Sequence, residues 1–200
     1  MTDYVDGYCE RVAPGLWGEP LNSLTNLAFL VAAVLVWRLA AGDRTGRLLA
    51  ALIGLVFATS TVFHLLATRW AAVGDSVGIL VFALVYAVLL TRAFCRRRFA
   101  WLAAPAFLAL TVVTALLGGG LYLSALIGLA AFAAVLAFER DAYWAHFAVA
   151  GAIFALSLSL RAVDRDVCDY VPAGTHFLWH LLNGVVLWLV SRVLVLKNRP

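Results

Sequence analysis

Long apolar runs separated by short polar breaks make up most of the chain. Seven runs match the roughly 20 apolar residues that a helix needs to cross a bilayer. They cover about residues 21–41, 47–68, 74–94, 99–117, 120–138, 142–162 and 173–196. Backbone polar groups in lipid must be satisfied within the segment, so each run is predicted to be a helix. We therefore predict an all-α fold, a seven-transmembrane helix bundle that forms one integral-membrane domain over residues 1–200.

Composition supports this prediction and narrows the choice of partners. The chain is 64% hydrophobic and 13% charged, which is more apolar than a soluble domain. The membrane bilayer is therefore an expected partner. The net charge of +4 would suggest nucleic-acid binding in a soluble protein, but here the charges divide by side of the membrane. We expect no nucleic-acid partner.

The charged residues predict an orientation. One side of the bundle carries eleven basic and three acidic residues, and the other carries four basic and eight acidic residues. The basic side comprises Arg38, Arg44, Arg47, Arg92, Arg96, Arg97, Arg98, Arg140, Arg192, Lys197 and Arg199. Because basic loops stay in the cytoplasm, the C-terminus is predicted there, and the acidic segment 1–20 is predicted to be extracytoplasmic. The composition, rich in Ala, Arg and Leu, suggests a bacterial plasma membrane.

Five polar residues within the runs fall in one layer near the predicted outer face: Ser60, His64, Asp75, His176 and His180. His176 and His180 are four residues apart, so they share one helix face. Histidine in lipid needs a partner, and three imidazoles with one open position form a catalytic zinc pattern. Singly, Asp75 in the first turn of its predicted helix could be a cap, Ser60 could bond to its own backbone, and the histidines could be interfacial. Their occurrence in one layer favours a joint site.

The combined pattern resembles a known family. It consists of Ser60-x-x-x-His64, then Asp75, then His176-x-x-x-His180 across seven helices. Before the first helix stand Tyr8-Cys9-Glu10 and Glu19-Pro20-Leu21-Asn22-Ser23-Leu24-Thr25-Asn26. Together these motifs resemble the alkaline ceramidases, a branch of the seven-transmembrane hydrolase superfamily that also includes adiponectin-receptor-like proteins. The resemblance extends from Asp6 to the seventh helix.

The resemblance implies a zinc-dependent ceramidase, which is a hydrolase of linear amide C–N bonds. The substrate would be ceramide or a similar long-chain lipid amide, and the products a fatty acid and a sphingoid base. His64, His176 and His180 would hold Zn²⁺, which activates water near neutral pH. Asp75 would act as general base and acid, and Ser60 would stabilise the oxyanion. The active site would face the extracytoplasmic side.

The resemblance also implies Ca²⁺ near the zinc, held by acidic residues of the N-terminal segment. Glu10 and Glu19 match two of the family's positions. Gly7 stands where the family has Asp, with Asp6 one step earlier, and Val12 stands where it has Asn. Calcium is accordingly expected at Glu10 and Glu19 with Asp6 and backbone carbonyls, which hard cations accept. The alternative is a solvated acidic segment.

Two of the three cysteines fall on the predicted outer side. Cys9 lies in the N-terminal segment, and Cys168 lies between the sixth and seventh runs. An oxidising exterior permits a disulfide, and the family resemblance implies one between these positions. Two unpaired thiols are the alternative, because sequence does not establish their distance.

Other functions remain open at this point. One keeps the zinc and changes the lipid substrate. Another is a lipid receptor or sensor in which the zinc is structural. A third is bis-histidine haem binding, which would use His64 with His176 or His180 but leaves the third histidine and Asp75 without a role.

Overall fold

The computed structural model describes residues 3–95 and 97–198, which are all-α apart from one isolated β-bridge between Tyr4 and Thr68. Within these residues, seven helical spans are long and apolar enough to cross a membrane. They are Pro20–Leu39, Arg44–Leu66, Arg69–Phe94, Arg97–Leu116, Gly120–Phe138, Trp144–Ala162 and His176–Lys197. The predicted all-α class and the predicted number of helices able to span a membrane are confirmed. Arg96 and Arg199, used above to predict the orientation, lie outside the described residues.

Two of the spans are divided. The first comprises α1 (Pro20–Thr25) and α2 (Leu27–Leu39), and in the fourth a short 3₁₀ helix, η2 (Arg97–Leu102), precedes α5 (Ala103–Leu116). The undivided spans are α3 (Arg44–Leu66), α4 (Arg69–Phe94), α6 (Gly120–Phe138), α7 (Trp144–Ala162) and α8 (His176–Lys197). Two further 3₁₀ turns lie outside the spans, η1 (Leu16–Gly18) before α1 and η3 (Asp164–Val167) between α7 and α8.

Local backbone chemistry shifts the helix ends from their predicted positions. The Asp43 side chain accepts hydrogen bonds from the backbone N–H groups of Thr45 and Gly46, both at 3.0 Å, so α3 begins at residue 44 rather than 47. Its end comes before Ala67, which is left-handed with φ 49°. The next helix, α4, begins at residue 69 rather than 74. Asp75 therefore lies in the second turn of α4, not in the first turn as predicted.

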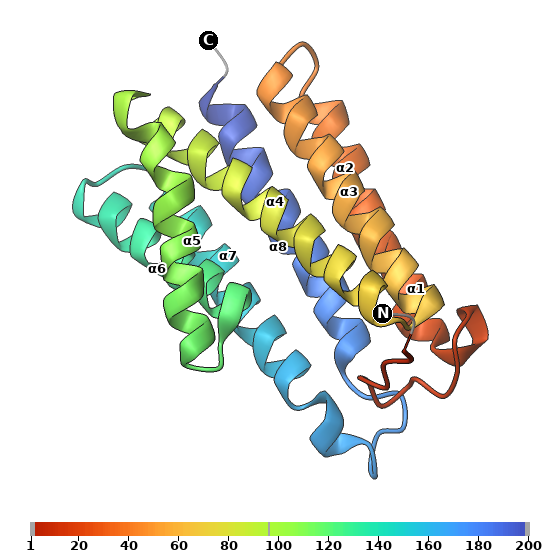
Figure 1. Cartoon of the computed structure of the whole chain (residues 1–200). Helices are drawn as coiled ribbons and strands as arrows, with labels where there is room; N and C mark the ends of the chain where they lie inside the picture. The colour runs from red at the N-terminus through yellow and green to blue at the C-terminus, as the bar shows by residue number, and fades with distance from the viewer. Residues whose placement is uncertain (1–2, 96, 199–200) are drawn as a thin grey trace.

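The helix α8 is the most enclosed of the seven spans and packs against α1, α2, α3, α4 and α7. Close approach to α2 depends on Gly184, where a Cβ atom would lie 2.8 Å from the Cβ of Ala28. Small residues allow such approach between membrane helices. Figure 1 shows the N-terminal segment and the α7–α8 connection at one end of the bundle, and the last turns of α8 at the other.

The segment before α1 is linked covalently and by a hydrogen bond to the end of the bundle where the α7–α8 connection lies. A disulfide joins Cys9 to Cys168 in the α7–α8 connection, with an S–S distance of 2.02 Å, which confirms the predicted pairing. The backbone N–H of Val5 donates to the carbonyl of Ala67 just after α3, at 2.8 Å. The segment therefore contacts both sides of the bundle end where α3 finishes and α8 starts.

Candidate metal centre

Three histidines converge beneath this segment. His64 lies near the end of α3, His176 is the first residue of α8, and His180 follows one turn later. One ring nitrogen of each lies within 4.8 Å of the others, and the three residues are only 1%, 2% and 1% exposed. In the described part of the chain, no other group of three His, Cys, Asp or Glu side chains is placed to share an ion. Three imidazoles fit Zn²⁺ with a fourth position left open.

Hydrogen bonds at Nδ1 hold two of the rings. His64 Nδ1 lies 2.9 Å from Oε2 of Glu19, and His180 Nδ1 lies 3.1 Å from the hydroxyl of Thr25. Arg11 Nη2 also lies 3.4 Å from His64 Nδ1, but a nitrogen that donates to a carboxylate cannot also accept, and the carboxylate is closer. With Nδ1 protonated, Nε2 of each ring is left as a metal ligand.

The third ring has a different environment. His176 Nδ1 is buried without a hydrogen-bond partner in the structure. The ring of Tyr8 stacks on it with centroids 3.8 Å apart. A buried nitrogen without a partner is costly, and a metal ion bound at that nitrogen would satisfy it. The donor set of all three rings therefore fits a metal such as zinc.

The position of His176 depends on Asp164, which is 2% exposed. Its Oδ1 accepts from the backbone N–H groups of Thr175 at 2.6 Å and His176 at 2.8 Å. Its Oδ2 accepts from the N–H of Cys9 at 3.1 Å. A carboxylate is stabilising at a helix start because it complements free N–H groups and the helix dipole. One side chain thus anchors the start of α8 and the N-terminal segment.

The other two predicted site residues lie next to the histidines. Ser60, one turn before His64 on α3, is 4% exposed. Asp75 on α4 interacts with Ser60 through its side chain, and its Oδ1 is buried without a hydrogen-bond partner. Both residues line a cavity of about 140 Å³ together with His176 and His180. The five residues predicted to form one layer are therefore neighbours, and the carboxyl group of Asp75 is available to a ligand in the cavity.

Sequence reasoning missed a cation on this cavity. Arg161, near the end of α7, lines it beside Asp75. Its guanidinium carbon lies 4.5 Å from the ring centroid of Tyr122 and 5.5 Å from that of Trp179, which is cation–π geometry. The sequence feature that could have identified it is an arginine within a predicted span, since intramembrane charges mark functional sites.

The three residues expected to bind calcium have other partners. Glu10 accepts from the backbone N–H groups of Leu21 at 2.7 Å and Asn22 at 2.8 Å, at the start of α1. Asp6, whose side chain is 59% exposed, forms a 3.6 Å ion pair with Arg165. Glu19 is fully buried and pairs with Arg11. Across residues 3–95 and 97–198 these three carboxylates form no shared cluster that could hold an ion.

Burial dominates the electrostatics of Glu19. Removal from water raises the pKa of the Glu19 carboxyl to about 7, and the Arg11 guanidinium and Asn22 amide oppose the rise. The Asn22 amide donates to Oε2 at 3.1 Å. The partners of Glu19 therefore favour the ionised form that His64 requires as an acceptor.

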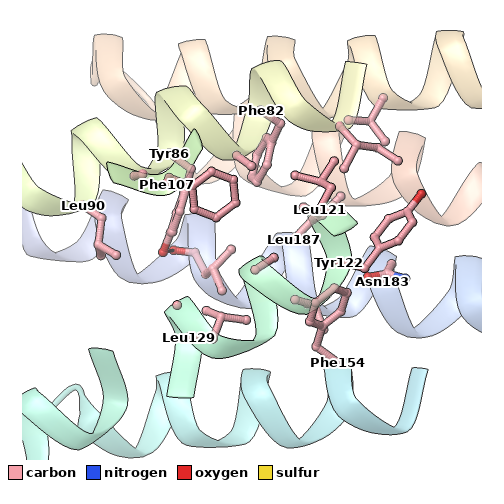
Figure 2. A pocket seen from close by; sticks show the side chains of 18 of the residues that line it. Phe82, Tyr86, Leu90, Phe107, Leu121, Tyr122, Leu129, Phe154, Asn183 and Leu187 are labelled. Carbon is pink, nitrogen blue, oxygen red and sulfur yellow. Dashed lines mark hydrogen bonds between the residues drawn. The ribbon is translucent and has the colours of Figure 1, made fainter. Parts of the chain in front are cut away.

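A second, apolar cavity of about 220 Å³ adjoins the first. Residues Phe29, Val56, Ile79, Tyr122 and Trp179 line both. Figure 2 shows aromatic and aliphatic side chains from α4, α6, α7 and α8 around the space, among them Phe82, Leu129, Phe154 and Leu187. Cavities of this kind bind apolar ligands through buried surface.

No protein-family profile matches the chain, and no curated protein matches it significantly. The structure itself shows a seven-helix bundle of the membrane-protein kind with a buried cluster of three histidines that could hold a metal ion such as Zn²⁺.

Proposed function

We propose that the protein is a zinc-dependent intramembrane hydrolase that cleaves ceramide, or a similar long-chain lipid amide, to a fatty acid and a sphingoid base. The observation that carries the proposal is the convergence of the three histidines with Ser60 and Asp75 beside an apolar cavity. The sequence resemblance to the alkaline ceramidases supports the same substrate class and the same residue roles.

The chemistry needs an activated water, a proton carrier and a group that stabilises the oxyanion. His64, His176 and His180 would hold Zn²⁺, which would supply a Lewis acid that activates water near neutral pH. Asp75 accepts a proton from the water as the water oxygen adds to the amide carbonyl carbon. Ser60 donates a hydrogen bond to the carbonyl oxygen as negative charge develops there. Asp75 then delivers the proton to the amine nitrogen as the C–N bond breaks.

The shape of the site supports a lipid substrate. The polar cavity carries Ser60, Asp75 and two of the histidines, and the adjoining cavity is lined almost wholly by apolar side chains. An amide at the first cavity would therefore place a hydrocarbon chain in the second. Burial of each methylene contributes about 0.8 kcal/mol, so the apolar cavity favours long chains.

The proposal includes an orientation, with the histidine end of the bundle outside and the C-terminus in the cytoplasm. The Cys9–Cys168 disulfide at the histidine end supports it, because disulfides persist in oxidising compartments. The basic residues at the opposite end support it by the positive-inside rule. We place the protein in a bacterial plasma membrane as a multi-pass protein.

The test combines metal analysis with turnover. Detergent-purified protein should contain one zinc per chain and should release fatty acid from a long-chain ceramide. Chelation should abolish release, and added zinc should restore it. Asp75→Asn, which keeps the three histidines, is the matched control that should retain zinc without turnover. Bound zinc without hydrolysis of any lipid amide would refute the enzymatic function and favour a receptor. A Soret absorption band would show bound haem and refute the zinc site.

A further inference from the structure

Arg11 is a buried cation that the catalytic proposal does not use. It is 4% exposed, and its side chain forms an ion pair with the fully buried carboxylate of Glu19. Nη1 donates to the carbonyl of Val5 at 2.8 Å. The guanidinium carbon also lies 4.9 Å from the ring centroid of Tyr8 and 4.6 Å from that of Phe63. A buried charge needs such pairing and hydrogen bonding to be tolerated.

These contacts join the N-terminal segment to the bundle. Val5 and Tyr8 belong to the segment, and Phe63 lies on α3 beside His64. The tie made by Arg11 is separate from the disulfide, which runs to the α7–α8 connection. One cation therefore holds the segment against the side of the bundle that carries His64.

The ion pair also reaches the histidine cluster. Glu19 pairs with Arg11 through Oε1, and its Oε2 lies 2.9 Å from His64 Nδ1. A carboxylate in this position fixes the tautomer and ring orientation of a metal-ligating histidine. Removing the guanidinium would leave that carboxylate buried with the Asn22 amide and His64 as its side-chain partners.

The buried carboxylates of this region have partners within the protein. Of the three acids expected to bind calcium, Glu19 alone is fully buried, and Arg11 neutralises it. The buried carboxylate of Asp164 accepts hydrogen bonds from backbone N–H groups, including that of Cys9. A divalent ion at Glu19 would sit beside the guanidinium and be repelled by it.

We propose that Arg11 is a built-in structural cation: it holds the N-terminal segment over the histidine cluster and, through Glu19, orients His64, so that the protein needs no calcium. Arg11 acts through Glu19 and is a positioning residue. The effect on zinc rests on the proposed zinc site, whereas the calcium and stability readouts do not.

The first test measures calcium directly on the full chain. Protein purified without added calcium should contain no stoichiometric calcium by elemental analysis. Titration with CaCl₂ in a calorimeter should give no saturable heat, and the unfolding midpoint should stay constant. A site at a hundredfold saturation would raise the midpoint by roughly 5–10 °C. Co-purified calcium, or a rise of that size, would overturn the proposal.

The second test uses Arg11→Gln, with Arg165→Gln as the matched control. Arg165 also contacts the N-terminal segment, but its side chain is 58% exposed. Arg11→Gln should lower zinc affinity by roughly 10- to 100-fold, the usual range when an outer-shell partner of a metal ligand is removed. It should also lower the unfolding midpoint. Arg165→Gln should change neither. Arg11→Lys keeps the charge and should recover part of the loss.

The outcomes separate this proposal from the zinc enzyme. Unchanged zinc affinity in folded Arg11→Gln would overturn the positioning role. Wild-type protein that binds no zinc would refute the proposed function, and the calcium and unfolding measurements would still decide the role of Arg11. If Arg11→Gln does not fold, the calcium titration of the wild type and the zinc affinity of Arg11→Lys keep the test decisive.

Discussion

Replacing Asp164 with alanine should loosen the start of α8 and the N-terminal segment together. The buried carboxylate accepts from three backbone N–H groups, those of Cys9, Thr175 and His176. A hydrogen bond to a charged group contributes about 1.5–3 kcal/mol, and a buried donor left unpaired costs about 1–3 kcal/mol. Water entering the space left by the side chain would satisfy part of this, so we expect a loss of about 3–5 kcal/mol.

Thermal unfolding of the zinc-loaded protein in detergent measures the effect. For a chain of this size, 1 kcal/mol corresponds to roughly 2–4 °C in the midpoint, so Asp164→Ala should lower it by roughly 6–20 °C. Zinc affinity should fall as well, because His176 is the first residue of the loosened helix. Asp164→Asn keeps one acceptor oxygen and should lose less. Asp166→Ala is the control, since Asp166 is an exposed acid on the same 3₁₀ turn.

Two results would refute this reasoning. One is an Asp164→Ala midpoint within about 2 °C of the wild type, the range of a neutral surface substitution. The other is an equal loss in Asp166→Ala, which would assign the effect to charge on the turn rather than to the three hydrogen bonds.

Further predictions concern the site and its closure. Asp75→Asn should keep zinc bound and lower turnover by about 10²- to 10⁴-fold, the usual contribution of general acid–base catalysis; full activity would remove Asp75 from the mechanism. His176→Ala should lose both zinc and activity, and normal zinc content would contradict its assignment as a ligand. Arg161→Met should weaken inhibition by the product fatty acid by about tenfold, because a hydrogen bond between the guanidinium and the carboxylate is lost; unchanged inhibition would place the carboxylate elsewhere. Cys9→Ser should lower the free energy of unfolding by about 5 kcal/mol, as expected for a long closed loop, and chemical unfolding of both forms would measure the difference.

The seven spans follow from local properties of the chain. The length and hydropathy of each run predict a membrane-spanning helix, because a helix in lipid satisfies its backbone hydrogen bonds internally. The helix ends were less predictable, since Asp43 lengthens α3 at its start by capping, and Ala67 ends it through a left-handed backbone. The shift at α4 moved Asp75 by a turn of helix yet left it beside Ser60.

The candidate metal ligands were also accessible from the sequence. Histidine is rare within apolar runs, the i, i+4 spacing places His176 and His180 on one helix face, and alternation of direction between spans brings His64 to the same depth. These features are periodic or topological, so they do not depend on details of side-chain packing.

The roles of Asp164 and Glu19, which position the histidines, are decided by the tertiary structure alone. Asp164 contacts Cys9 across 155 positions, and Glu19 contacts His64 across 45. From the sequence, Glu19 was an expected calcium ligand and Asp164 one of several acids on the outer side. Which carboxylate is buried, and whether it faces a guanidinium, a histidine or backbone N–H groups, is decided only when distant segments pack together, because each of these interactions becomes strong only after water is removed.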